Sequence, residues 1–199
     1  MIRSSLLIAF DGTHASGKTT LIYSVAAQLK QMGINCQILP EPARNSPLVD
    51  DVVLRDIGNF DIPLELDLIA SHIMQCTRAT RNSSLILSDR TPINVLAYTN
   101  LLCKPNNEME SKLLENVSSF VNTWMHYYDL IFYCQDYFSP NHKNDKMRSK
   151  VEDIQAEVDE QNRILYESSK INIEFLPRDL SLLDRTSAVI NTIKKKNLI

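Results

Sequence analysis

Eight residues near the N-terminus constrain the fold more than any other stretch. They read GTHASGKT, from Gly12 to Thr19, and fit the pattern G-x-x-x-x-G-K-[ST]. A hydrophobic run, SLLIAF (5–10), precedes them, and a helical pattern (18–32) follows and stops at Gly33. This order predicts a strand, a glycine-rich turn and a helix, which is the context in which such a turn binds phosphate groups.

Apolar runs of strand length alternate with longer helical patterns along the whole chain. Strands are expected at 5–10, 35–39, 85–88, 130–134 and 171–176. Helices are expected at 18–32, 63–79, 92–102, 108–126, 150–168 and 180–195. This rhythm predicts an α/β protein with a five-stranded parallel sheet and helices on both faces. Together with the glycine-rich turn, it indicates the three-layer P-loop NTPase fold.

Composition and charge exclude several other classes. The 199 residues are 44% hydrophobic and 23% charged, as expected for one domain covering 1–199. A net charge of −3 provides no overall basic field, so neither nucleic acid nor an anionic membrane is the expected partner. No apolar run approaches the roughly 20 residues of a membrane helix. The four cysteines lack metal-ligand spacing, and we expect a reduced, cytoplasmic protein. A homodimer stays possible at this stage.

The glycine-rich turn has a specific chemistry. Glycines at 12 and 17 allow close backbone approach, so successive N–H groups can converge on phosphate oxygens. Lys18 would contact the terminal phosphates, and the Thr19 hydroxyl would bind Mg²⁺. The expected cofactors are therefore ATP and Mg²⁺. His14 occupies a variable position of the motif, and we assign it no catalytic role. The residues expected to bind the nucleotide are Gly12, Thr13, His14, Ala15, Ser16, Gly17, Lys18, Thr19 and Thr20.

Charged residues follow the second and third predicted strands. Glu41 and Arg44 come after 35–39, and Asp89 and Arg90 follow LILS (85–88). Because ligands of open α/β sheets bind outside the carboxyl ends of the strands, all four should lie near Lys18. Asp89 would hold Mg²⁺, while Arg90 and Arg44 would bind the acceptor substrate. Glu41 would orient that acceptor or take its proton; the alternative is a solvated loop acid.

A polar, basic segment, DYFSPNHKNDKMRSK (136–150), follows the fourth predicted strand. We expect a lid at about 138–151 whose cations close over the triphosphate and exclude water. Arg148 is the expected catalytic residue of this lid. The alternative interpretation is a solvated basic loop.

Several of these stretches resemble known kinases. FDGTHASGKTT, Glu41-Pro42 and DRTPINVLAY (89–98) resemble the thymidylate kinase and deoxynucleoside kinase group. EPAR, DRTPINVLAY, YDLIFY and NDKMRS are also similar to ribosylnicotinamide kinase-type ATPase-like domains. The resemblance implies that Lys18 and Thr19 serve the phosphates and Mg²⁺, and that Asp89 binds the metal. It also implies that Arg90 contacts the acceptor and that Arg148 belongs to the lid.

Three functions compete at this point. The first is an ATP- and Mg²⁺-dependent kinase acting on a small nucleoside or nucleoside monophosphate. For a hydroxyl acceptor Glu41 would be the base, whereas for a phosphate acceptor Arg44 and Arg90 would hold it. A GTPase switch is disfavoured because the chain has neither an Asp-x-x-Gly switch nor an Asn-Lys-x-Asp base reader. The third is an ATP-binding regulatory module with little or no kinase activity.

Overall fold

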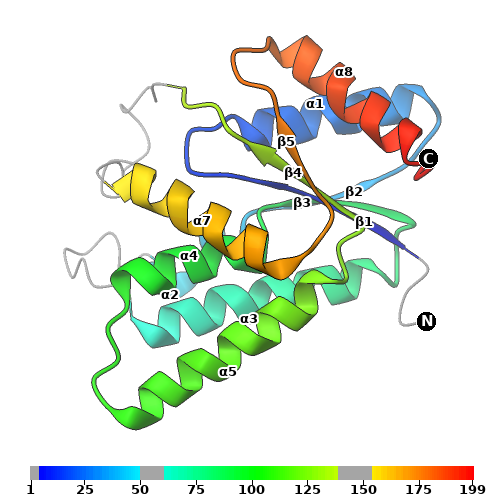
Figure 1. Cartoon of the computed structure of the whole chain (residues 1–199). Helices are drawn as coiled ribbons and strands as arrows, with labels where there is room; N and C mark the ends of the chain where they lie inside the picture. Colours follow the sequence, from blue (N-terminus) through cyan, green and yellow to red (C-terminus); the bar gives the residue numbers. More distant parts are fainter. Residues whose placement is uncertain (1–4, 50–60, 139–153) are drawn as a thin grey trace.

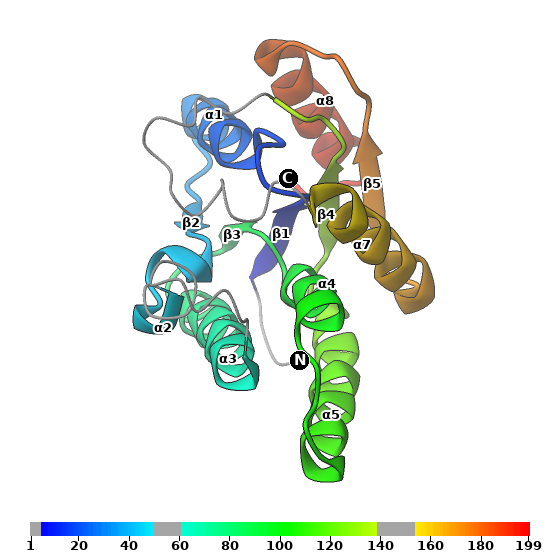
Figure 2. The ribbon, with the colours of Figure 1, turned by 90° about the vertical axis from the view of Figure 1, so that its left-hand side faces the viewer.

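The computed structural model describes residues 5–49, 61–138 and 154–199. Its strands form one parallel sheet in the order β2-β3-β1-β4-β5, with helices on both sides (Figures 1 and 2). The α/β fold predicted from the sequence is confirmed. The strands are β1 (Leu6–Asp11), β2 (Gln37–Leu39), β3 (Leu85–Asp89), β4 (Leu130–Cys134) and β5 (Ile173–Leu176).

The longer helices also lie where the periodicity predicts them, within a few residues. They are α1 (Lys18–Gln31), α3 (Ile62–Ala79), α4 (Pro92–Leu102), α5 (Glu108–Met125), α7 (Gln155–Ser169) and α8 (Leu182–Lys195). Two short elements were not predicted, η1 (Pro42–Arg44) and α2 (Pro47–Val49). Each begins at a proline, whose fixed φ suits the first helical position, but three residues are too few to show a period.

The first strand lies at the centre of the sheet and contributes to both cores. Leu7 and Ala9 belong to the core cluster shared with α3, α4 and α5, whereas Ile8 and Phe10 belong to the cluster shared with α1 and α8. Successive strand residues point to opposite faces, so an uninterrupted apolar run is what a strand covered on both faces requires. Figure 1 shows α1 and α8 on one side and α3, α4, α5 and α7 on the other.

Two expectations reach beyond the described residues. The predicted lid, 138–151, overlaps them only at Phe138, and Arg148 lies outside them.

Among the helices that the structure describes, none combines the length and apolarity that crossing a bilayer requires.

The turn after β1 leaves no room for a side chain. Gly12 has φ 133°, and a Cβ built on it would lie 2.4 Å from the backbone oxygen of Cys134 in β4. Gly33, just after α1, has φ 79°, but a Cβ there would meet no atom within 4 Å. A side chain at position 33 would therefore cost only the left-handed backbone conformation, whereas one at position 12 would also clash with β4.

We expect Gly33→Ala to lower the free energy of unfolding by about 1 kcal/mol, the cost of a left-handed backbone for an L-residue. Gly12→Ala should lower it by about 3 kcal/mol, because the clash with the Cys134 carbonyl adds an overpacking cost. Urea denaturation of both variants measures the difference. Equal losses would show that β4 moves aside at no cost.

Candidate functional site

Three successive carbonyl groups of the loop between β1 and α1, those of His14, Ala15 and Ser16, are bonded from outside the loop. Left-handed backbone at Ala15 (φ 57°) and Gly17 (φ 78°) permits this turn. The Thr13 carbonyl accepts hydrogen bonds from the Ser16 hydroxyl at 2.9 Å and from Lys18 Nζ at 2.5 Å. Consecutive N–H groups that face one way form an anion-binding concavity, so the loop has the form of a phosphate site.

The outward carbonyls of the loop take hydrogen bonds from three distant segments. The donors come from α7, from the chain after β4 and from α8. The bonds are Gln155 Nε2 to His14 O (3.0 Å), Phe138 N to Ala15 O (2.9 Å) and Arg185 Nη2 to Ser16 O (3.0 Å). The sequence analysis missed Gln155 and Arg185, because each lies more than 130 residues from the loop and neither belongs to a motif.

The side chain of Lys18 is buried beneath the loop. Burial and, to a smaller extent, the charge of nearby Arg90 lower the pKa of its ammonium to about 8, against the opposing effect of Asp89 and Glu41. Its hydrogen bonds go to Thr13 O and Ser16 Oγ. Both acceptors belong to the loop, so Lys18 lies where a bound phosphate would meet it. Thr20, also expected to bind nucleotide, is exposed on α1.

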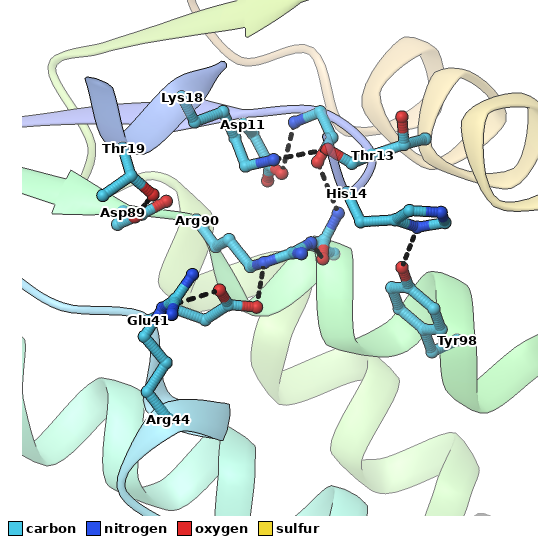
Figure 3. Close-up of polar contacts among 12 residues, drawn as sticks. Asp11, Thr13, His14, Lys18, Thr19, Glu41, Arg44, Asp89, Arg90 and Tyr98 are labelled. Carbon is cyan, nitrogen blue, oxygen red and sulfur yellow. Dashed lines mark hydrogen bonds and ion pairs between the residues drawn. The ribbon is translucent and has the colours of Figure 1, made fainter. Parts of the chain in front are cut away.

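Thr19 and Asp89 form a pair of oxygen groups beside the loop (Figure 3). The Thr19 hydroxyl donates to Asp89 Oδ2 at 2.6 Å, and Asp89 is 3% exposed. The other carboxylate oxygen, Oδ1, is buried and has no hydrogen-bond partner among the described residues. Mg²⁺ prefers oxygen ligands, and in phosphate sites it takes one or two from the protein and the rest from phosphates and water. The pair therefore fits Mg²⁺. No cluster of three or more metal-ligating side chains occurs in the described ranges.

The structure brings Glu41, Arg44 and Arg90 together near Lys18, as the sequence predicted. Glu41 Oε1 lies 2.5 Å from Arg90 Nε, and Oε2 lies 3.6 Å from Arg44 Nε. Figure 3 shows the Glu41 carboxylate between the two guanidinium groups. Burial alone would raise the pKa of Glu41, but Arg90, Lys18 and Arg44 outweigh it and hold the pKa below its ordinary value. This carboxylate is ionised at neutral pH.

The imidazole of His14 and the phenol of Tyr98 lie close to the group formed by Glu41, Arg44 and Arg90. The sequence assigned no catalytic role to His14, yet its side chain is buried, and Nδ1 lies 3.4 Å from the hydroxyl of Tyr98 on α4. Figure 3 shows this pair on the same side of the loop as Arg90. The variable loop position thus lies on the same side of the loop as Arg90, which no sequence pattern indicated.

A fully buried carboxylate at the end of β1 supports the loop from below. Asp11 Oδ1 accepts from Gly12 N at 2.6 Å, and Oδ2 accepts from Thr91 Oγ1 at 2.6 Å and from the hydroxyl of Tyr166 on α7. Burial raises the pKa of Asp11, although these hydrogen bonds and Arg90 oppose the rise. The sequence analysis did not single out Asp11, although its position at a strand end directly before Gly12 could have identified it as part of the site.

The sheet order, the loop and the Thr19–Asp89 pair together define the P-loop fold, which this chain shares with solved nucleoside and nucleotide kinases. More narrowly, the chain belongs to the AAA_28 family: the family model, described as an AAA domain, matches residues 7–181.

Known proteins share parts of the sequence and the fold. A thymidylate kinase of Nitratidesulfovibrio vulgaris (strain DP4) is 32% identical over 102 residues, which make up 47% of this chain and 45% of that kinase. The chain therefore spans less than half the length of this curated relative. A NadR protein solved in complex with NR superposes with a TM-score of 0.69 at 19% identity, covering 96% of this chain and 50% of that one. Deoxyadenosine kinase from M. mycoides, solved with bound dATP, superposes with a TM-score of 0.61 at 16% identity. The match covers 94% of this chain and 98% of that kinase.

The Asp11 network predicts a specific pattern of stability. Asp11→Ala should lower the free energy of unfolding by about 3 kcal/mol, because it leaves the buried hydroxyls of Thr91 and Tyr166 without their acceptor. Asp11→Asn, which keeps one acceptor oxygen and carries no charge, should cost less. Urea denaturation at neutral pH tests this order.

The same variants have a pH signature. The pKa of Asp11 is raised in the folded state above its ordinary 3.8, so its stabilising contribution is complete below 3.8 and is lost as pH rises through the folded value. The stability difference between the wild type and Asp11→Asn should therefore shift against the wild type across that window. A difference that is constant with pH would contradict the raised pKa.

Proposed function

We propose that the protein is an ATP- and Mg²⁺-dependent phosphotransferase acting on a nucleoside or a nucleoside monophosphate. The observation that carries the proposal is the Glu41–Arg90 ion pair, 2.5 Å long and close enough to Lys18 to shift its pKa. A protein that only hydrolyses ATP needs a site for the phosphates and the metal. This one adds a carboxylate and two arginines that suit an acceptor, which favours transfer over hydrolysis.

The donor side would work as follows. Backbone N–H groups of the loop bind the β- and γ-phosphates, and Lys18 exchanges its bonds to Thr13 O and Ser16 Oγ for phosphate oxygens. Thr19 and Asp89 would hold Mg²⁺, which when bound neutralises charge on the phosphates. We place the Arg148 lid over this site as part of the proposal, to exclude water.

The acceptor side offers two arrangements. With a hydroxyl acceptor, the oxygen attacks the γ-phosphorus, the bond from that phosphorus to ADP breaks, and Glu41 takes the hydroxyl proton. Glu41 is already ionised, so it can act as the base at neutral pH. With a monophosphate acceptor, Arg44 and Arg90 would have to release Glu41 and bind the phosphate. The ion pairs already present favour the neutral acceptor, a nucleoside.

Partners and organisation complete this proposal. We propose a single domain over 1–199 that acts in the cytoplasm on a small acceptor, without nucleic acid or membrane, in line with its net charge of −3. A homodimer stays a prediction. The alternative function is an ATP-binding regulatory module with little or no kinase activity, which the AAA description of its family supports.

An acceptor screen tests the function. Purified protein with ATP and Mg²⁺ is offered nucleosides, including ribosylnicotinamide, and their monophosphates, and ADP formation is measured. We expect ADP formation to depend on an acceptor and to disappear in Lys18→Ala. Equal ADP formation with and without every acceptor would contradict the kinase and support the regulatory module.

Glu41→Gln identifies the acceptor class within that screen. It removes the base but keeps the size of the side chain, so kcat with a nucleoside should fall by about 10² or more. A monophosphate acceptor needs no strong base and should lose far less. A small loss with the best acceptor would reject Glu41 as the base.

The lowered pKa of Lys18 predicts how nucleotide affinity depends on pH. Bound triphosphate favours the charged ammonium, so above pH 8 the protein must take up a proton when it binds ATP, and its affinity falls as pH rises. Calorimetry at pH 9 in two buffers of different ionisation enthalpy should show uptake of about one proton. Lys18→Arg stays charged and should show none. Absence of uptake in the wild type would place Lys18 away from the phosphates.

A further inference from the structure

A buried guanidinium lies directly behind the phosphate loop. Arg185 on α8 is 2% exposed, and its Nη2 donates to the backbone oxygen of Ser16 at 3.0 Å. The two residues are 169 positions apart in the sequence. No motif of the chain includes Arg185, and the phosphotransfer scheme above gives it no role.

Besides Ser16, two neighbours hold this guanidinium in place. The carboxylate of Asp136, after β4, lies 3.7 Å from Arg185 Nε, and the Phe138 ring centroid lies 5.6 Å from the guanidinium carbon. Asp136 is itself positioned, because its Oδ1 accepts from Asp179 N at 2.9 Å. A side chain at position 17 would meet Arg185 Nη1 at 2.9 Å, so the guanidinium fills the space beside the loop backbone.

This placement has two physical consequences for the loop. A peptide group whose carbonyl is bound from outside directs its next N–H inward, so the bond to Ser16 O helps to orient the N–H of Gly17 toward the phosphates. The positive charge also lies in a water-poor environment, where its attraction for phosphate is screened less than in solvent. Both effects act on a bound triphosphate and not on the acceptor.

Stability alone does not account for the group. Desolvation of a buried Arg–Asp pair offsets much of the mutual attraction, so such a pair is a weak source of folding free energy. Its location against the loop carbonyl is the informative fact. We propose that Arg185 is a positioning residue for the donor phosphates: it holds the Ser16–Gly17 peptide in the phosphate-binding orientation. This inference rests on the proposed function only in that the loop binds a nucleoside triphosphate.

The chain offers a closely matched control. Arg163 on α7 also pairs with a carboxylate, Asp159 at 2.9 Å, and also lies over aromatic rings, at 5.5 Å from Tyr133 and 5.4 Å from Phe175. Its side chain donates hydrogen bonds to Asp159 and Gln135, neither of which belongs to the loop. Replacing Arg163 therefore removes the same kinds of contact away from the phosphate site.

The test compares Arg185→Met, Arg185→Lys and Arg163→Met. We expect Arg185→Met to raise both the ATP Kd, measured by calorimetry without acceptor, and the ATP KM about tenfold, the effect of one charge-assisted hydrogen bond. The acceptor KM should not change. Arg185→Lys keeps the charge and one donor and should raise the ATP Kd about threefold. Arg163→Met should leave the ATP Kd unchanged.

A purely structural role gives a different result. Loss of folded protein lowers the apparent kcat but leaves the KM for ATP where it was. An ATP Kd for Arg185→Met within twofold of the wild type, or an equal rise in the acceptor KM, would overturn the proposal. If Arg185→Met does not fold, Arg185→Lys decides, and a wild-type Kd overturns the proposal there too. A wild type that binds ATP but transfers no phosphate would contradict the kinase alone, since the Kd comparison needs no acceptor.

Discussion

The site depends on one constraint: the phosphate loop must keep its carbonyl oxygens directed outward so that its N–H groups can face an anion. Isolated, such a loop would exchange these orientations freely. Here the donors to its carbonyls come from α4, α7, α8 and the chain after β4. Asn94 donates to Gly12 O at 3.4 Å. Gln155, Phe138 and Arg185 donate to the carbonyls of His14, Ala15 and Ser16, in that order. The binding loop is thus held by the packing of the whole domain.

The ion pair between Arg90 and Glu41 depends on the way β3 ends. Arg90 follows the strand with φ 77°, and its backbone N–H donates to Phe10 O in β1 at 2.9 Å. Ser88 Oγ donates to the Arg90 carbonyl at 3.1 Å, so the left-handed residue is bonded on both sides. Its side chain reaches Asn94 and Glu41. The strand end therefore directs Arg90 toward Glu41, while the preceding residue, Asp89, faces Thr19.

Sequence patterns predicted most of the fold and the part of the site that lies at strand ends. Buried strands carry continuous apolar runs, and the parallel sheet brings its carboxyl ends to one edge. Glu41, Asp89 and Arg90 follow from that rule alone. Gln155 and Arg185 do not, because a hydrogen bond between segments more than 130 residues apart leaves no local pattern. The contact between His14 and Tyr98 also joins distant segments, so no local pattern predicts it.

By itself, the sequence determined the order of strands and helices, the phosphate loop and the residue types at the ends of the strands. These depend on short-range periodicity and on the backbone freedom of glycine, both of which can be read from neighbouring residues. Only the tertiary structure decided that Glu41 lies between Arg44 and Arg90, that Asp11 is bonded to Tyr166, and that Arg185 lies behind the loop. The reason is that burial and charge pairing depend on contacts between distant segments.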